Sequence, residues 1–234
     1  MHPVYLDHNA TTPVRPEVAR AMAACLEGPP GNPSSLHRFG REAAALRDEA
    51  RERLAAACGC TAGRVIFTSG GTEADNLALR GRAGRAPAHL VTAGTEHEAV
   101  LHTAQALQRE GVDVTVLPVD GNGQVTPEDV DRAIRPETAL VSLMAANNET
   151  GVLLPLPRIG EICRRRGVLF HTDAVQFLGK APFTFDELPL DLASVSAHKI
   201  GGPKGIGALL IREGVRISPL VTGGGQERKV RPGT

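Results

Sequence analysis

The sequence predicts an α/β fold in which a mostly parallel β-sheet is flanked by helices. Short apolar runs that resemble strands recur along the 234 residues, and longer segments with helical periodicity separate most of them. Several of the strand-like runs are continuously apolar, as expected when a strand is covered on both faces. A sheet held between two layers of helices accounts for both observations.

The expected elements follow in order from the N-terminus. Two helices come first, at residues 17–26 and 38–57, and the stretch 29–33 is rich in proline and glycine, which predicts the loop between them. Strands and further helices then alternate. The expected strands are 65–68, 89–92, 112–117, 140–144, 168–171, 192–195 and 208–211. The expected later helices are 73–79, 99–110, 127–134 and 159–166, and 183–189 is expected to be a loop.

Composition narrows the classes of function. Net charge is zero, with 26 basic and 26 acidic residues and no basic block, so nothing favours nucleic acid. No apolar stretch is long enough to cross a bilayer, and the start of the chain lacks a charged-then-apolar leader, so secretion is not expected. Cys58 and Cys60 have no second cysteine or histidine pair at zinc spacing, so no metal is expected. A reducing cytoplasm fits these thiols.

Lys199 is the strongest candidate for chemistry. It lies in a bend rich in serine and glycine, residues 194–205, between two strand-like runs, where partial desolvation favours a neutral, nucleophilic amine. Only four positions are lysine, and the other basic residues are arginine, whose guanidinium cannot form an imine. Taken alone, however, a lysine is more often a solvated surface charge.

Asp173 adds a second element of the same chemistry. It follows the apolar run 168–170, and ligands of open α/β sheets bind beyond the carboxyl ends of the strands. A lysine Schiff base together with an Asp partner for a protonated ring nitrogen is what pyridoxal phosphate requires of its protein. The alternative is that Asp173 caps a following helix.

A phosphate site is also predicted. The run 65–68 reads as a buried strand, Ser69-Gly70-Gly71-Thr72 makes a tight bend, and helical character begins at Glu73. Free backbone N–H groups and the helix dipole meet an anion in such an arrangement. An ordinary capped turn is the alternative.

At this point the residues carry a resemblance. The chain resembles the cysteine desulfurases, which belong to the class V aminotransferase group of fold-type I pyridoxal-phosphate enzymes, and it corresponds to their aspartate-aminotransferase-like large domain. The matches are ordered and extend from end to end. The matching segments are 5–12, 31–35, 67–73, 95–97, 147–151, 171–176, 196–199 and 223–228.

The resemblance implies roles for the residues around the cofactor ring. Lys199 would be the Schiff-base lysine, and Asp173 would hold the pyridinium nitrogen. His97 would stack on the ring and take part in proton transfer. Gln176 would donate to the phenolic oxygen, with Asn148 nearby. Read alone, His97 is a surface residue of a first helical turn, Asn148 part of a plain turn and Gln176 a solvated helix position.

The resemblance also implies a phosphate site, a substrate loop and a dimer. Thr234 would reach the phosphate of a partner subunit's cofactor, which implies a homodimer. Asn32 falls in the substrate-side loop. The residues implied to hold the phosphate are Gly71, Thr72, Ser196 and His198.

The function implied is the conversion of L-cysteine to L-alanine, with the sulfur passed to a protein thiol and on to an iron–sulfur scaffold or a tRNA-thiolation protein. The family's sulfur-accepting cysteine lies well downstream of the lysine, whereas all four cysteines here precede Lys199. The resemblance therefore implies a fragment: an N-terminal segment (1–14) and a cofactor-binding large domain (15–234), without the C-terminal small domain. Such a chain is expected to bind cofactor and to turn over cysteine poorly. Another class V enzyme, such as an aminotransferase or a selenocysteine lyase, and a non-catalytic dimerisation or binding module are the alternatives.

Overall fold

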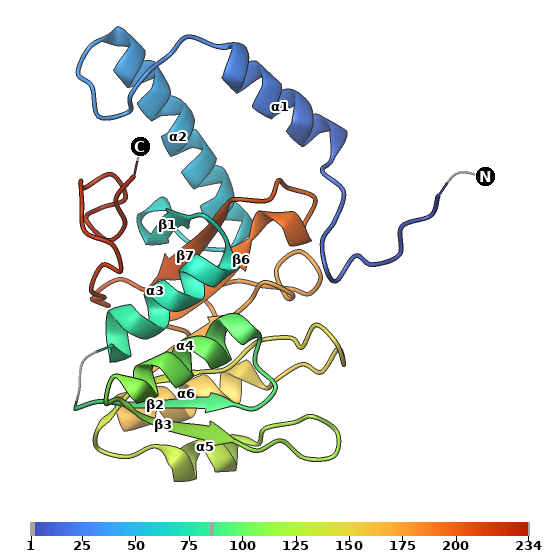
Figure 1. Ribbon diagram of the computed structural model, residues 1–234, viewed down its shortest axis with the longest axis vertical. Helices are drawn as coiled ribbons and strands as arrows, with labels where there is room; N and C mark the ends of the chain where they lie inside the picture. The colour runs from blue at the N-terminus through green and yellow to red at the C-terminus, as the bar shows by residue number, and fades with distance from the viewer. Residues whose placement is uncertain (1–2, 85–86, 234) are drawn as a thin grey trace.

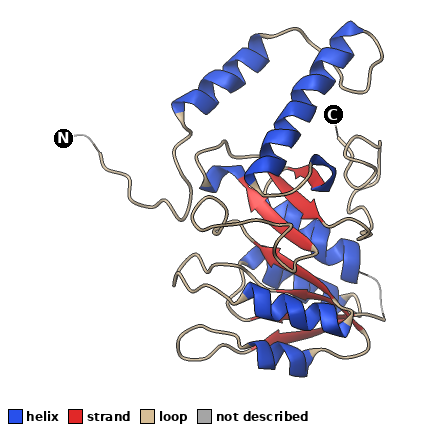
Figure 2. Cartoon of the chain, turned by 180° about the vertical axis from the view of Figure 1, so that it is seen from behind, coloured by secondary structure: helices blue, strands red, loops and turns tan. Residues whose placement is uncertain are grey.

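A single seven-stranded sheet organises the computed structural model, which describes residues 3–84 and 87–233. The strand order is β1-β7-β6-β5-β4-β2-β3 (Figures 1 and 2). Neighbours from β6 to β3 pair in parallel, and only β7 is antiparallel to the strands beside it. The predicted mostly parallel sheet is therefore confirmed. The strands are β1 (Val65–Thr68), β2 (His89–Ala93), β3 (Asp113–Leu117), β4 (Thr138–Ser142), β5 (Leu169–Asp173), β6 (Leu192–Ser196) and β7 (Gly207–Ile211).

Helices cover both faces of this sheet. The α-helices are α1 (Pro16–Glu27), α2 (Arg38–Ala57), α3 (Gly71–Ala83), α4 (Glu98–Arg109), α5 (Pro127–Ala133) and α6 (Leu156–Arg166). Two short 3₁₀ turns, η1 (Ala62–Arg64) and η2 (Ala197–Lys199), were not predicted. None of the helices in the described ranges is long and apolar enough to cross a membrane.

Alternation along the strands builds two apolar cores, one on each face. Leu90, Leu140 and Leu192 pack with α3 and α4. The residue that follows each of them packs in the other core, with α5, α6 and the end of α2. Successive side chains of a strand point to opposite faces, so a strand buried on both sides must be apolar throughout. This is the physical reason for the continuous apolar runs in the sequence.

Strand boundaries differ from prediction at two places that matter. β4 begins at Thr138, two residues before the predicted start, because Thr138 pairs with His89 of β2. β5 extends to Asp173, two residues beyond the predicted end, because Asp173 pairs with Ser194 of β6. The strand therefore carries Asp173 on a hydrogen-bonded ladder and not on a loose loop.

The direction of the strands places their carboxyl ends at one edge of the sheet. β7 is antiparallel to both β1 and β6, so β1 runs in the same direction as β2 to β6. The segments that follow β1, β2, β4, β5 and β6 therefore leave the sheet at the same edge. Ligands of open α/β sheets bind there.

The first two helices extend away from the sheet (Figure 1). No residue of α1 is buried in the described structure, and its Met22 and Leu26 are exposed. The buried residues of α2 are Gly40 in its first turn and, near the sheet, Arg51 and Ala55. The segment before α1 passes over the sheet edge, with Thr12 N donating to His198 O at 2.8 Å and Arg15 N to Gly201 O at 2.9 Å.

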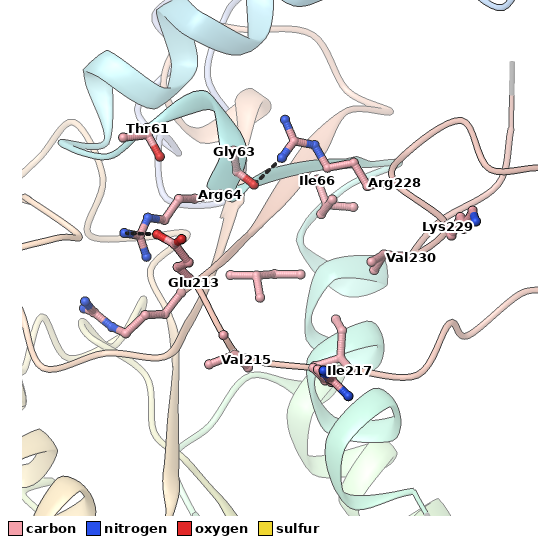
Figure 3. Close-up of a pocket in the computed structure, with 14 residues that line it drawn as sticks. Thr61, Gly63, Arg64, Ile66, Glu213, Val215, Ile217, Arg228, Lys229 and Val230 are labelled. Atoms are coloured by element: carbon pink, nitrogen blue, oxygen red, sulfur yellow. Dashed lines mark hydrogen bonds and ion pairs between the residues drawn. The ribbon is translucent and has the colours of Figure 1, made fainter.

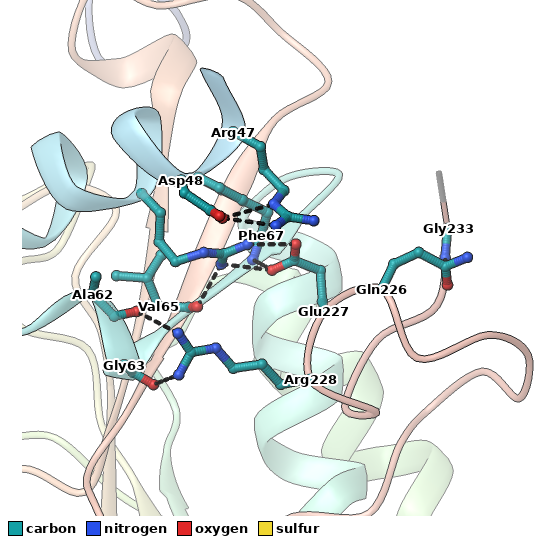
Figure 4. Close-up of polar contacts among 11 residues, drawn as sticks. Arg47, Asp48, Ala62, Gly63, Val65, Phe67, Gln226, Glu227, Arg228 and Gly233 are labelled. Carbon is teal, nitrogen blue, oxygen red and sulfur yellow. Dashed lines mark hydrogen bonds and ion pairs between the residues drawn. The ribbon is translucent and has the colours of Figure 1, made fainter. Parts of the chain in front are cut away.

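A buried ion pair fixes the C-terminal segment to this framework. The Arg51 guanidinium donates two hydrogen bonds of 2.7 Å to the Glu227 carboxylate, and the two side chains are only 6% and 7% exposed. Glu227 also accepts from Phe67 N at 2.9 Å, while Arg51 donates to Val65 O at 2.8 Å (Figure 4). Arg228 reaches the carbonyls of η1 from the same segment.

We predict that Arg51→Ala lowers the free energy of unfolding by about 3–5 kcal/mol, because Glu227 would keep a buried charge without its partner. Arg53→Ala is the matched control: Arg53 lies on the same helix in an exposed pair with Glu49, and such pairs contribute at most about 1 kcal/mol. Urea unfolding of both variants measures the difference. Similar losses in the two variants would contradict the importance given to the buried pair.

Candidate functional site

A cavity of about 260 Å³ opens at the carboxyl edge of the sheet. It is lined by the segments that follow β1, β2, β4, β5 and β6, together with Ala10 of the N-terminal segment. Nine residues that the sequence predicted for a site meet here. They are Gly71, Thr72, His97, Asn148, Asp173, Gln176, Ser196, His198 and Lys199.

Asp173 forms the buried acidic end of the cavity. Its side chain is the last of β5, is only 6% exposed and accepts a hydrogen bond from Val175 N at 2.9 Å. Burial raises the pKa of this carboxyl, and the Val175 amide, His97 and Lys199 act in the opposite direction. The chain continues into a turn at residues 175–177, so Asp173 holds a turn and the helix-cap alternative does not apply. A buried carboxylate in this position favours a cationic ligand group.

Lys199 ends the 3₁₀ turn η2 and is half-buried on the cavity wall. Its Nζ donates to the carbonyl oxygens of Asn9 and Ala10, the latter at 3.0 Å. Burial lowers the pKa of Lys199 and the nearby Lys180 lowers it further, while Asp173 and Asp7 oppose the shift. A lowered pKa increases the fraction of neutral amine, which is the nucleophilic form.

The turn between β1 and α3 supplies the anion-binding side. α3 begins at Gly71, and Gly71 and Thr72 both line the cavity. A Cβ built on Gly71 would lie 2.9 Å from Val175 Cγ2, so only glycine leaves this wall open. Gly70 has φ +157° and ψ −178°, a conformation that is essentially restricted to glycine. The helix N-terminus with its dipole therefore faces a space that an anion can enter.

The ion pair between Glu73 and Arg231 stabilises this turn. Glu73 Oε2 accepts from Ser69 N at 2.6 Å, and Arg231 Nε donates to Glu73 Oε1 at 2.8 Å. The C-terminal segment is thereby connected to the turn that carries Gly71. The resemblance had no role for Glu73 or Arg231, and both were visible in the sequence only as members of matching or adjacent segments.

Two histidines and two amides complete the wall. His97 is the N-cap of α4, where its Nδ1 accepts from Ala99 N at 3.1 Å, and it also lines the cavity. His198 Nδ1 lies 3.1 Å from Thr11 Oγ1, and burial lowers the pKa of His198. Gln176 Nε2 donates to Asn9 O at 2.9 Å, and Asn9 Nδ2 donates to Asn148 O at 3.0 Å. His97 therefore both lies at the start of a helix and lines the cavity, so the two interpretations of this residue are compatible.

Sequence reasoning missed a buried polar chain that crosses the sheet beside the cavity. Ser142 Oγ lies 2.8 Å from His171 Nδ1, and His171 Nε2 lies 2.9 Å from Ser194 Oγ. Asp75 of α3 comes next. Its Oδ1 lies 3.6 Å from His171 Nε2, and this oxygen has no hydrogen-bond partner among the described residues. Burial raises the pKa of Asp75 well above its ordinary value, and the nearby Asp173 adds to the shift. The only signal in the sequence was the pair of serines within otherwise apolar strands.

The donor set fits one kind of cofactor. Small hydroxyl residues and the α3 N-terminus suit a phosphate, the buried Asp173 carboxyl suits a protonated ring nitrogen, and Lys199 suits an aldehyde. These three features line the same cavity. A cofactor with all three groups would therefore satisfy the site, including the buried acid.

One predicted residue in the described part of the structure does not line this cavity. Asn32 lies on a separate cavity of about 220 Å³ that it shares with Glu227 and Arg231, so its substrate role stays a prediction. Thr234 lies outside the described residues.

A larger cavity of about 730 Å³ lies between η1, the end of β7 and residues 228–230 (Figure 3). Two of the arginines that line it have partners: Arg64 pairs with Glu213 at 3.8 Å, and Arg228 donates to Gly63 O at 2.6 Å. None of the described residues that the sequence predicted for a site lines this cavity. The larger volume of this cavity therefore does not make it the candidate functional site.

Comparison with known proteins shows the family of this chain. Residues 4–232 match the family model described as Aminotransferase class-V. The chain is 48% identical over 234 residues to Cysteine desulfurase IscS of Dictyoglomus turgidum and 49% identical over 241 residues to the mitochondrial cysteine desulfurase of Arthroderma benhamiae. Each match covers 99% of this chain but only 59% and 48% of the relatives. The chain thus spans about half to three fifths of the length of these relatives.

Solved structures agree in fold. A NifS-like protein superposes with a TM-score of 0.95 at 42% identity, over 100% of this chain and 65% of that one. A structure described as SspA in complex with cysteine superposes with a TM-score of 0.96 at 37% identity, over 99% of this chain and 68% of that one.

We predict that His171 makes the fold sensitive to acid. Burial lowers the pKa of His171 to about 3, below the value of about 6.5 expected in an unfolded chain. A lowered folded pKa gives stability that is complete above pH 6.5 and is lost as the pH falls toward 3, at about 1.4 kcal/mol per pH unit. Burial raises the pKa values of Asp75 and Glu96, so these acids change the stability with pH in the opposite direction. Both acids are present in the wild type and in His171→Gln, the variant that tests the prediction.

Urea unfolding of the wild type and His171→Gln at pH 5, 6, 7 and 8 tests this. The advantage of the wild type over the variant should shrink by about 1 kcal/mol between pH 6 and 5 and should not change between pH 7 and 8. Parallel curves over the whole range would contradict a buried, neutral His171.

Proposed function

The chain belongs to the class V aminotransferases, which are pyridoxal-phosphate enzymes, and we propose that it is the cofactor-binding part of a cysteine desulfurase. The reaction proposed converts L-cysteine to L-alanine and passes the sulfur to a thiol. Because the chain spans only part of its relatives, the substrate, the residue roles and the partners are all part of this proposal.

The observation that carries the proposal is the presence of Lys199 and Asp173 in one cavity. They follow different strands, 26 positions apart in sequence, yet both line the same space of about 260 Å³. Seven further residues matching the desulfurase pattern line it with them. An ordinary surface lysine and an ordinary turn aspartate would have no reason to share a cavity.

Pyridoxal phosphate, when bound, supplies an aldehyde that captures amino groups and a ring that accepts electron density from the substrate. We assign its covalent attachment to Lys199 and the contact with its ring nitrogen to Asp173. We assign the ring face to His97 and the phenolic oxygen to Gln176, with Asn148 nearby. The residues assigned to the phosphate are Gly71, Thr72, Ser196 and His198.

Three side chains of this protein have separate roles in the proposed reaction. Asp173 keeps the ring nitrogen protonated, because a buried carboxylate is stabilised by a cation at contact distance. Lys199 would be the base whose Nζ accepts the proton from the substrate Cα. His97, at the mouth, is positioned to move a proton between the bound substrate and solvent.

The sulfur acceptor is proposed to lie outside this chain. The four cysteines are all in the described part of the structure, and none lines the cavity. Burial raises the pKa of Cys58 and Cys163 to about 12 and of Cys60 to about 11, so these thiols are poor nucleophiles. Cys25 is exposed on α1.

The remaining assignments complete the proposal. Residues 15–234 act as the large domain, preceded by the segment 1–14, and a homodimer brings Thr234 to a partner subunit's cofactor. An iron–sulfur scaffold or a tRNA-thiolation protein receives the sulfur. Cytoplasmic localisation is proposed because the free thiols suit a reducing compartment.

We predict that Asp173→Ala weakens cofactor binding by about two to three and a half decades, which corresponds to roughly 3–5 kcal/mol for a buried charge pair. The same substitution should raise the stability of the cofactor-free protein, because an acid without a cationic partner no longer has to be buried. Visible-absorbance titration with pyridoxal phosphate and urea unfolding measure the two effects.

Asp113→Ala is the control for this prediction, since Asp113 is an exposed acid of β3 paired with Arg135 away from the cavity. Equal cofactor affinity in the two variants would refute the role of Asp173.

The identity of the products tests the reaction class. The cofactor-loaded chain, given L-cysteine and dithiothreitol as an external thiol, should form alanine slowly. A keto acid would contradict the desulfurase assignment and indicate an aminotransferase. Rapid sulfide release would contradict the expectation that the sulfur acceptor lies outside this chain.

A further inference from the structure

A second lysine, Lys180, lies beside the site. It follows Gly179 in the segment after β5, and its Nζ contacts Gln176 Oε1 and lies 3.4 Å from Asn9 Oδ1. Lysine is rare in this chain, yet Lys180 and Lys199 both bond to Asn9. Neither the resemblance nor the comparisons give Lys180 a role.

Asn9 connects the two amines. Its backbone oxygen accepts hydrogen bonds from Lys199 Nζ and, at 2.9 Å, from Gln176 Nε2. Its side chain is held at both ends, with Nδ2 donating to Asn148 O at 3.0 Å and Oδ1 facing Lys180. Lys180 thus contacts both Asn9 and Gln176, the two residues that meet at the carbonyl to which Lys199 bonds.

The charges around Lys199 come from several elements. Lys180 acts against its protonation, and Asp173 of β5 and Asp7 of the N-terminal segment favour it. His198, the chain neighbour of Lys199, has its own pKa lowered by burial and by Lys199. Desolvation is the largest cause of the lowered Lys199 pKa, and Lys180 is the next. A nearby cationic group is an established means of activating a lysine amine.

We propose that Lys180 is a positioning residue for Lys199: it contacts Gln176 and Asn9, the residue whose backbone oxygen accepts from the Lys199 amine, and it places a positive charge near that amine. Through these contacts it fixes the direction of the Lys199 amine, and through its charge it increases the share of neutral amine. The inference deepens the proposed function and rests on Lys199 being the attachment point of the cofactor.

Attachment of pyridoxal phosphate to Lys199 as a function of pH tests the proposal. The protein is mixed with the cofactor at pH 6 to 10 and reduced with borohydride after short times, and the modified fraction of Lys199 is read by mass spectrometry. The rate of attachment should rise with pH as the amine loses its proton. In Lys180→Gln the midpoint of this rise should lie about half a unit to one unit higher than in the wild type.

Three comparisons separate charge from structure. Lys180→Arg keeps the charge and should keep the wild-type midpoint within about 0.2 units. Lys204→Gln, which removes an exposed lysine outside the cavity, should leave the midpoint unchanged. Raising the salt concentration should reduce the difference in midpoint between the wild type and Lys180→Gln, because salt screens the charge of the exposed Lys180.

Equal midpoints and equal salt responses in the wild type and Lys180→Gln would overturn the inference, even if attachment became slower. If the wild type itself never attached the cofactor at Lys199, the proposed function would fail, and the inference would fail with it. Lys180→Met, which also removes the charge, decides the question if Lys180→Gln does not fold.

Discussion

The fold buries a carboxyl group, that of Asp173, with no ion-pair partner among the described residues. Asp173 occupies the last rung of β5, where its backbone pairs with β6 and its side chain faces inward. A single amide hydrogen bond from Val175 does not compensate for the loss of water around a carboxylate. The buried Asp173 carboxyl therefore lowers the stability of the fold at the carboxyl edge of the sheet. A bound ligand that placed a positive charge against Asp173 would offset this desolvation free energy.

The surrounding structure holds Asp173 in a fixed position relative to Lys199 and to the anion-binding turn before α3. Parallel pairing of β4, β5 and β6 fixes the height of Asp173 relative to η2, which carries Lys199. On the other side, the Glu73–Arg231 pair holds the turn before α3, and the Arg51–Glu227 pair (Figure 4) anchors the segment that carries Arg231. The N-terminal segment adds Ala10 to the cavity wall, and its Asn9 accepts hydrogen bonds from Lys199 and Gln176. Three parts of the chain that are far apart in sequence are thus required to complete one cavity of modest size.

Much of this arrangement follows from the sequence, for identifiable reasons. Strands covered on both faces leave continuous apolar runs, and for that reason residues 65–68 and 192–195 could be located almost to the residue. The antiparallel placement of β7 and the extension of β5 to Asp173 depend on pairing between strands, which local pattern does not encode. Asp75 and His171 were missed because a buried polar chain has no period of its own. Lys180 looked like a surface charge because its partner, Asn9, lies 171 positions away. Asn32 was assigned by resemblance, and in the single chain it lies on another cavity.

The central claim is that Lys199 is the amine that binds an aldehyde cofactor within reach of Asp173. The most direct measurement is the visible spectrum of the purified chain with added pyridoxal phosphate, before and after borohydride, followed by peptide mapping. The account predicts a visible absorption band that borohydride removes, with the cofactor fixed on Lys199 and absent from Lys180, Lys204 and Lys229. Modification spread over these lysines, or no band that borohydride can remove, would contradict it.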